Sequence, residues 1–366
     1  MRVFYASASF APSYGGPAYS VSRLASHVRQ AGAETALWAP DGSAADLELP
    51  QPSPARLKGT LREALADFGA VDVLHDSGLW RPHNHALAAQ ARRIGTPLVV
   101  STRGMLDPWA LRHKWLRKAV AWQVYQRRDL NLASVLHVTS RQEMESVGRL
   151  GLRAPMRLIA NGVDLPDQTR GTPGDGPRRV VFLGRLHPIK GLTILIEAWG
   201  SLRPDGWELV LAGPDESGFQ CTLEAQVASL GLNHSVHFAG PVSGVEKDDL
   251  LRGATFFVLP SLSESFGMVV AEACAVGLPV VTTTAVPWPE LEEYECGFRS
   301  APNARALAAT LIKTMRLPEA TLASMGQRGR EFVKANFNWA SVSQQFIGLY
   351  EGLTMLEQSR NSRPTR

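Results

Sequence analysis

The chain has 366 residues, 45% of them hydrophobic, and this length and composition suit two domains that each bury a core of their own. Its net charge of +4 is concentrated in the first half, because residues 1–166 carry 20 Lys and Arg against 13 Asp and Glu, whereas the remainder carries 18 against 21. A basic first half favours an anionic partner, either a phospholipid surface or a pyrophosphate-linked substrate, and the absence of a zinc-finger, RNP or basic-zipper pattern argues against nucleic acid.

The sequence shows no sign of export or of a membrane span. No run approaches the roughly 18 apolar residues of a transmembrane helix, and the N-terminus lacks the charged start and apolar stretch of a secretion signal. Cys221, Cys274 and Cys296 have neither metal-ligand nor redox spacing, and we expect them to be reduced packing residues. These features predict a cytoplasmic protein.

Short apolar runs alternate with longer stretches of helical spacing in the first half of the chain. The expected helices include 19–30, 85–94 and 141–150. The expected strands are 3–7, 35–39, 71–75, 98–102, 134–139 and 157–160. This alternation predicts an α/β domain with an open parallel sheet, which we place at residues 1–165.

Three histidines surround the end of the strand predicted at 71–75. They are His75, His83 and His85, on either side of a segment that begins with Asp76. Their spacing is poor for a metal site. We expect His75 and His85 either to line a cleft that binds a second substrate or to have structural roles.

Residues 109–128 combine tryptophan with basic residues and contain no acidic residue. The basic residues are Arg112, Lys114, Arg117, Lys118, Arg127 and Arg128. If the segment is helical, Leu111, Trp115 and Trp122 share one face flanked by Arg112 and Lys118, an arrangement typical of helices at a lipid surface. It predicts docking on the anionic inner face of the cell membrane. The alternative is that the Trp side chains pack in the first domain and the charges are only solvated.

A break in the pattern at residues 166–177 separates the two halves. This stretch is rich in Gly and Pro, and we interpret it as a linker. The expected strands beyond it are 179–183, 208–212, 236–239, 255–260 and 279–283. They predict a second doubly wound domain at 178–338, followed by a helix and tail, 339–366, that could cross back to the first domain. Two such domains would leave a cleft between the carboxyl ends of their sheets.

Arg185 and Lys190 follow the first strand of the second domain, in the run 182–192. Across a Pro-containing turn, both can face one diphosphate, Arg with a planar fork and Lys with a mobile point charge. Such cations would stabilise a departing nucleoside diphosphate without a metal, and no Asp-x-Asp motif is present to bind one. The alternative is two exposed cations on a turn.

Glu264 and Glu272 frame the strongest motif, which follows the strand predicted at 255–260. Glu264 stands in the loop, and Glu272 lies about two turns along the next helix. The backbone N–H groups of Phe266, Gly267 and Met268 at the helix start are available to an anion or a sugar hydroxyl. A nucleotide sugar has the extended shape that such a pair could hold, although two glutamates eight residues apart are often only solvated.

Taken together, these motifs resemble those of the family 4 glycosyltransferases, a retaining group that shares its fold with the glycogen synthases. The similarity covers nearly the whole chain and rests on the segments 10–17, 159–164, 184–191, 258–261 and 264–272. It implies the GT-B fold, in which two doubly wound Rossmann-like domains face a central cleft.

For the donor, the resemblance implies that Glu264 contacts the sugar near its reacting carbon and Glu272 holds the ribose hydroxyls. Arg185 and Lys190 would bind the diphosphate, and the three amides at the helix start would take sugar hydroxyls or phosphate oxygens. The segment 238–242, with Gly240 and Val242, would flank the base.

For the acceptor side, the resemblance implies that the loop with Gly15 and Gly16 lines the acceptor site and approaches the donor phosphates. Arg103 stands where many relatives carry a histidine. Arginine cannot act as a base at neutral pH, but it can bind a phosphate or a carboxylate. The run 102–109 resembles a bacterial subgroup linked with exopolysaccharide and O-antigen assembly.

The resemblance therefore implies a retaining, metal-independent transfer of a hexosyl unit from a nucleotide-diphosphate sugar, without a cofactor, to a glycan or polyprenyl-diphosphate-linked oligosaccharide. One alternative is a nucleotide-sugar epimerase or hydrolase of the same fold. Another is an inactive sugar-nucleotide-binding scaffold, which would often lose Glu264 or Lys190. A nicotinamide enzyme is disfavoured, because no Gly-x-Gly-x-x-Gly follows the first strand.

Overall fold

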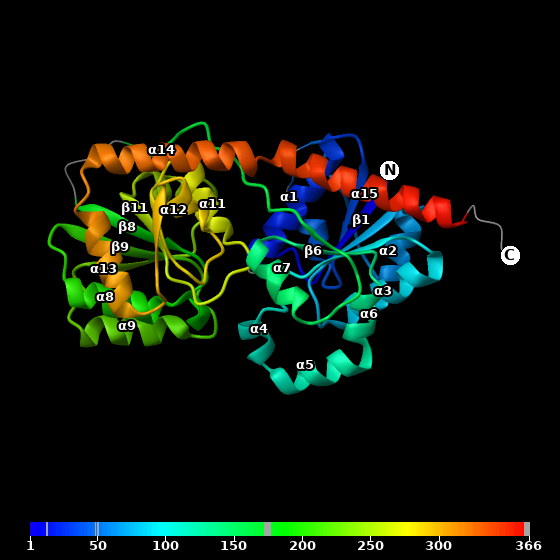
Figure 1. Cartoon of the computed structure of the whole chain (residues 1–366), viewed down its shortest axis with the longest axis horizontal. Coiled ribbons are helices and arrows are strands. Elements are labelled where there is room, and N and C mark those ends of the chain that lie inside the picture. The colour runs from blue at the N-terminus through cyan, green and yellow to red at the C-terminus, as the bar shows by residue number, and fades with distance from the viewer. Residues whose placement is uncertain (12–13, 48, 50, 172–176, 362–366) are drawn as a thin grey trace. The chain divides into compact units, whose positions relative to one another are not determined.

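Two parallel β-sheets organise the chain, one in each of two units. The computed structural model describes residues 1–11, 14–47, 49, 51–171 and 177–361. One unit comprises Met1–Gly162 together with the C-terminal helix α15 (Trp339–Asn361), and the other comprises Val163–Asn338 (Figure 1). Among the described residues, no helix combines the length and the apolarity needed to cross a membrane.

The sheet of the first unit has seven strands in the order β3-β2-β1-β4-β5-β6-β7, all of them parallel. The strands are β1 (Arg2–Ser7), β2 (Glu34–Trp38), β3 (Ala55–Leu57), β4 (Val73–Ser77), β5 (Leu98–Ser101), β6 (Val135–Val138) and β7 (Met156–Leu158). The strand order reverses between β1 and β4, and ligands of open α/β sheets bind at such a point, beyond the carboxyl ends of the strands.

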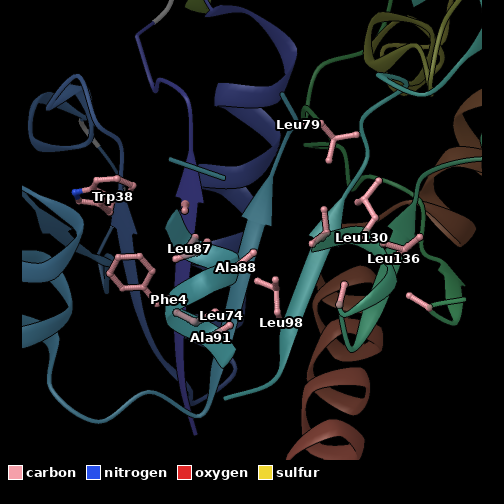
Figure 2. Close-up of a cluster of buried hydrophobic side chains, with 14 of the residues drawn as sticks. Phe4, Trp38, Leu74, Leu79, Leu87, Ala88, Ala91, Leu98, Leu130 and Leu136 are labelled. Carbon is pink, nitrogen blue, oxygen red and sulfur yellow. The ribbon is translucent and has the colours of Figure 1, made fainter. Parts of the chain in front are cut away.

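The helices of the first unit cover both faces of this sheet. They are α1 (Gly16–Gln30), α2 (Leu61–Phe68), α3 (Pro82–Ile94), α4 (Pro108–Arg112), α5 (Trp115–Ala121), the π-helical Trp122–Gln126, α6 (Arg127–Asn131) and α7 (Arg141–Gly148), with a 3₁₀ turn at Ser43–Asp46. Alternate strand residues point to opposite faces. Phe4 of β1 joins a core with α2 and α3, whereas Tyr5 joins a core with α1 and α15. Figure 2 shows the first of these cores, with Phe4 and Leu87 among its labelled side chains.

A buried polar chain ties α15 to the sheet. His137 Nε2 lies 2.8 Å from the Ile159 carbonyl oxygen, which can only accept, so this nitrogen carries the proton of a neutral ring. Ser101 Oγ lies 2.6 Å from His137 Nδ1 and 2.7 Å from His75 Nε2. His75 Nδ1 lies 2.7 Å from the hydroxyl of Tyr350 on α15, and that hydroxyl donates to the Tyr5 hydroxyl of β1 at 3.1 Å. Burial lowers the pKa of His137 to about 3 and holds the pKa of His75 well below its usual value, which keeps both rings neutral.

The sheet of the second unit has six strands in the order β10-β9-β8-β11-β12-β13, again all parallel. The strands are β8 (Arg178–Leu183), β9 (Trp207–Ala212), β10 (Val236–Gly240), β11 (Phe256–Leu259), β12 (Val280–Thr283) and β13 (Gly297–Ser300). The helices are the 3₁₀ turn Pro188–Lys190, α8 (Leu192–Leu202), α9 (Phe219–Ser229), α10 (Gly244–Arg252), α11 (Met268–Ala275), α12 (Glu290–Glu293), α13 (Ala304–Met315) and α14 (Glu319–Asn336). The order reverses between β8 and β11.

The predicted α/β class with two parallel sheets is confirmed, but two strands escaped prediction. β3 is three residues long and largely exposed, and β13 contains Gly297, Arg299 and Ser300, so neither has the apolar run of a buried strand. The stretch interpreted as a linker is only partly described, because residues 172–176 lie outside the described residues. Its earlier part packs on the second unit, where Arg170 forms an ion pair with Glu319 at 2.6 Å.

Candidate functional site

The loops after β8 and β11 come together at the point where the order of the second sheet reverses. Gly191, after β8, has φ +66°, and a Cβ there would lie 2.1 Å from the carbonyl oxygen of Pro260, which follows β11. The Leu262 amide donates to the Ile189 carbonyl at 2.8 Å. This close backbone approach, which glycine allows, brings the predicted Lys190 and Glu264 within reach of each other.

Lys190 and Glu264 form the central ion pair of this site. Their Nζ and Oε1 atoms lie 2.5 Å apart, and the side chains are only 15% and 14% exposed. Ser261 Oγ donates to the same carboxylate oxygen at 2.9 Å, and Thr283 Oγ1 in turn donates to the Ser261 carbonyl oxygen at 2.5 Å. Hydrogen bonds from two loops and one strand therefore fix the position of the Glu264 carboxylate.

Arg185 is held by a glutamate that sequence reasoning did not identify. Its Nη1 lies 2.5 Å from Glu216 Oε2, with both side chains more than a third exposed. Backbone hydrogen bonds join the two loops, since Leu186 donates to Pro214 at 2.8 Å and Glu216 donates to Leu186 at 3.2 Å. The available signal was the acidic pair at 215–216 after the Gly-Pro turn that ends β9.

The start of α11 presents backbone amides rather than the Phe266 side chain. Phe266 is buried, and its ring packs at 5.4 Å from the Trp288 ring, while Trp288 Nε1 donates to the Phe266 carbonyl at 2.5 Å. Gly267 then adopts φ +82°, and α11 begins at Met268. The amides in the first turn of a helix have no acceptor within the helix, so this turn is suited to an anion or a hydroxyl.

Glu272 lies further along α11 and forms an ion pair with Lys247 of α10. The two charged atoms are 3.3 Å apart, and both side chains are largely buried. Burial raises the pKa of Glu272; Lys247 acts in the opposite direction, and Asp164 and Asp248 add to the increase. Lys247 was another residue that the sequence did not single out.

The predicted base-flanking residues precede α10. Gly240 ends β10 with φ +71°, and its carbonyl accepts from the Gly213 amide at 2.7 Å. Val242 is half-buried two residues later. In the described part of the chain, no group of three or more His, Cys, Asp or Glu side chains could hold a metal ion.

In the first unit, the candidate residues differ in accessibility. Gly15 has φ +77° directly before α1, and nothing lies within 4 Å of a Cβ placed on Gly16; the neighbouring residues 12 and 13 lie outside the described residues. His75 belongs to the buried chain that holds α15, so the expectation that it lines a substrate cleft is not supported. His85 pairs with Asp129 at 2.6 Å, a carboxylate that Arg92 also binds at 2.8 Å.

The basic segment after β5 forms α4, α5, the π-helical turn and α6 (Figure 1). Of the three side chains on the predicted face, only Trp115 is exposed. Leu111 and Trp122 pack against the core, and Lys118 folds back to donate to the Ala110 carbonyl. The exposed apolar side chains of the segment are Trp115 (60%), Leu116 (63%), Val120 (64%) and Val124 (71%). Leu116, Val120 and Val124 recur at four-residue spacing, so helical geometry gathers them on one side, and Trp115 directly precedes the first of them. We call these four residues the apolar ridge.

Comparisons with known proteins identify the family. The profile described as "Glycosyl transferases group 1" matches residues 167–332, and the "Glycosyl transferase 4-like domain" matches residues 15–162. The chain is 30% identical to D-inositol 3-phosphate glycosyltransferase 2 of Catenulispora acidiphila, over 83% of this chain and 76% of the relative. The chain belongs to the group 1 glycosyltransferases. It is also 28% identical to the phosphatidyl-myo-inositol mannosyltransferase of Mycobacterium leprae, over 85% of this chain and 80% of that relative.

Solved structures show the fold of this glycosyltransferase. Sucrose-phosphate synthase from Thermosynechococcus elongatus superposes with a TM-score of 0.79 at 21% identity, covering 97% of this chain and all of that one. Anabaena HepE in complex with UDP-glucose superposes with a TM-score of 0.78 at 22% identity, covering 96% of this chain and all of that one. The predicted GT-B fold is thereby confirmed.

Proposed function

We propose that this glycosyltransferase transfers a hexosyl unit with retention, and without a metal ion, from a nucleotide-diphosphate sugar to a glycan or polyprenyl-diphosphate-linked oligosaccharide. The reaction would take place at the cytoplasmic face of the cell membrane, in bacterial exopolysaccharide or O-antigen assembly. The observation that carries the proposal is the largely buried Lys190–Glu264 pair beside the amides that start α11.

These groups suit the chemistry of a departing nucleoside diphosphate. When the bond between the sugar C1 and the diphosphate oxygen breaks, negative charge grows on the diphosphate, and Lys190 and Arg185 would stabilise it. The acceptor oxygen forms the new bond to C1 on the face from which the diphosphate leaves, and its proton passes to the departing phosphate oxygen. Glu264 would contact the sugar, and Glu272 the ribose hydroxyls.

The lack of a metal requirement is proposed because two protein cations, Lys190 and Arg185, would serve the role that a divalent ion has in metal-dependent transfer. Activity should therefore survive excess EDTA. Loss of transfer in the chelator, restored by added magnesium or manganese, would contradict this part of the proposal.

The membrane location is proposed from the apolar ridge and the exposed cations around it. Arg112, Lys114, Arg117, Arg127 and Arg128 are all exposed, and no acidic residue interrupts the segment between them. Exposed tryptophan and aliphatic side chains beside cations favour the interface of an anionic bilayer, where a polyprenyl-linked acceptor would reside.

A donor panel tests the central claim. UDP, GDP, ADP and CMP sugars are added to the protein, and its melting temperature is measured, because only a ligand that binds the native state raises it. We expect one nucleotide class to raise the melting temperature and to support transfer of labelled sugar to an extract of lipid-linked oligosaccharides. Stabilisation by no nucleotide sugar would refute the proposal.

The same assay separates the two alternatives. An epimerase or hydrolase would convert the donor at full rate without any acceptor, whereas a transferase should need the acceptor for most of its turnover. An inactive scaffold would bind the donor and convert none of it. The retained Lys190–Glu264 pair argues against the scaffold.

A further inference from the structure

Arg103 lies at the carboxyl ends of two strands in the first unit, where its side chain is fixed by neutral partners. It follows β5 after a single residue. Its Nε donates to Ser77 Oγ at 3.1 Å, at the end of β4, and its Nη1 donates to Asn161 Oδ1 at 2.7 Å. Both partners hold the guanidinium in place without balancing its charge.

No carboxylate among the described residues lies within ion-pair distance of Arg103. Glu143 is the carboxylate whose charge raises the pKa of Arg103. Its own oxygens already accept from Thr102 Oγ1 at 2.6 Å, from the Thr139 amide and hydroxyl at 2.7 Å each, and from the Gly104 amide. Burial lowers the pKa of Arg103 to about 10, so the side chain stays charged at neutral pH.

Two other arginines with limited exposure are neutralised by carboxylates. Arg92 pairs with Asp129 at 2.8 Å, and Arg170 pairs with Glu319 at 2.6 Å. A half-buried cation is stable only when a counter-charge or strong hydrogen bonds compensate the loss of water. At Arg103, the Nη2 donors meet no acceptor in the described part of the chain and remain available to a ligand.

The backbone of Arg103 also has an uncommon conformation that the surrounding structure enforces. Arg103 has φ +50°, a conformation uncommon for residues other than glycine, and Gly104 continues it with φ +70°. The hydrogen bonds from Thr102 and Gly104 to Glu143 hold this turn on both sides of Arg103. Strained conformations that the surrounding structure enforces concentrate at binding sites.

We propose that Arg103 binds a carboxylate or phosphate group carried by one of the two substrates of the transfer reaction. The inference rests on the proposed function, because it assigns the anionic group to a donor or an acceptor. The group could belong to a donor with a uronic acid as its sugar, or to an acceptor with a phosphate near the accepting hydroxyl. In both cases the planar guanidinium would engage two anionic oxygens.

Matched ligand pairs test the proposal and separate its two sources. The donor arm compares the dissociation constants of the nucleotide-glucuronic acid and the nucleotide-glucose, with the base chosen by the donor panel. The acceptor arm compares a hexose 6-phosphate with the same free hexose, in the presence of the nucleoside diphosphate. In the arm that contains the true ligand, we expect roughly ten- to hundredfold tighter binding of the charged member, as one charge-assisted contact provides.

Two variants remove the charge in different ways. Arg103→Gln deletes it, and Asn161→Asp keeps the arginine but gives it an internal carboxylate at the 2.7 Å contact. Both should abolish the preference for the charged ligand and leave the affinity for its neutral partner within about twofold. The control is Arg149→Gln on the same unit, whose exposed pair with Glu145 spans 3.9 Å and should have no effect.

The outcomes distinguish this inference from the proposed function. If the parent protein binds charged and neutral ligands equally in both arms, or if the preference survives in Arg103→Gln, the inference is overturned while donor binding still supports a transferase. If Arg103→Gln is unfolded, the result for Asn161→Asp decides. If no nucleotide sugar binds the parent protein, the proposed function itself fails.

Discussion

Replacing two side chains of the apolar ridge should release the protein from anionic membranes. Trp115 and Val120 are 60% and 64% exposed, so neither is needed for the core. Fully burying a large apolar side chain is worth roughly 1.5–3 kcal/mol, and the exposed fraction of these two corresponds to about 1–2 kcal/mol each. The variant Trp115→Ser plus Val120→Ser should therefore bind about 30-fold more weakly or worse.

Sedimentation with vesicles that contain anionic phospholipid measures this loss. The control is Ile94→Ser on α3 of the same unit, where a side chain that is 45% exposed lies outside the segment and should have no effect. A charge variant, Lys114→Glu plus Arg117→Glu, should weaken vesicle binding more strongly at low salt than at high salt. Each cation near the membrane surface adds about 1 kcal/mol to binding, and salt screens this contribution. Unchanged sedimentation of both double variants would refute docking through this ridge.

Three further predictions concern the two units separately. Lys190→Ala should lower kcat with saturating donor by about a hundredfold or more. It should also lower the melting temperature, because it leaves the largely buried Glu264 without its partner, so turnover is measured well below that temperature. Near-normal turnover would remove Lys190 from the reaction, and Lys334→Ala on the exposed side of α14 serves as the control. Glu216→Gln should tighten the binding of the nucleoside diphosphate several-fold in calorimetry, because the ligand no longer competes with a carboxylate for Arg185; weaker binding would contradict this. His137, with its pKa lowered to about 3, must stay neutral in the folded protein, so its contribution to stability is present above about pH 6.5 and decreases as the pH falls toward 3. Urea unfolding should show the stability difference between the parent and His137→Gln shrinking by about 2 kcal/mol from pH 7.5 to pH 5, and a constant difference would exclude the neutral ring.

The sequence was sufficient for the fold because burial on both faces of a parallel sheet leaves long apolar runs. It could not reveal β3 or β13, which lie at sheet edges and include polar or exposed residues. The motif residues around Glu264 were found because strand, glycine turn and helix are contiguous in the chain. Their partners Glu216 and Lys247 were missed, since each lies on a different loop or helix and is brought in only by the sheet order.

Contacts between segments that lie far apart in the chain also explain the errors in the first unit. A histidine at a strand end can serve a ligand or the core, and only the returning helix α15, which begins some 260 residues later, buries His75 with the Tyr350 hydroxyl. In the basic segment, periodicity predicted a helix correctly but not which side of it faces the core. The helix is interrupted between α4 and α5, at His113 and Lys114, and Lys114 has φ +52°. Residues after this break therefore do not continue the helical periodicity of α4, and Leu116 and Val120 point outward.

The charges of the candidate donor site imply an order of events during binding. Lys190 and Glu264 are largely shielded from water, so separating them would leave two poorly solvated charges and is costly. Arg185 and Glu216 are each more than a third exposed, and such a pair contributes only about 0–1 kcal/mol. An arriving diphosphate would therefore exchange with Glu216 at Arg185 at little cost, while Lys190 would keep its pair with Glu264 as it meets the diphosphate and Glu264 meets the sugar. We therefore expect the exposed pair to open, so Glu216→Gln should change nucleotide affinity and Lys190→Ala should change the rate of transfer.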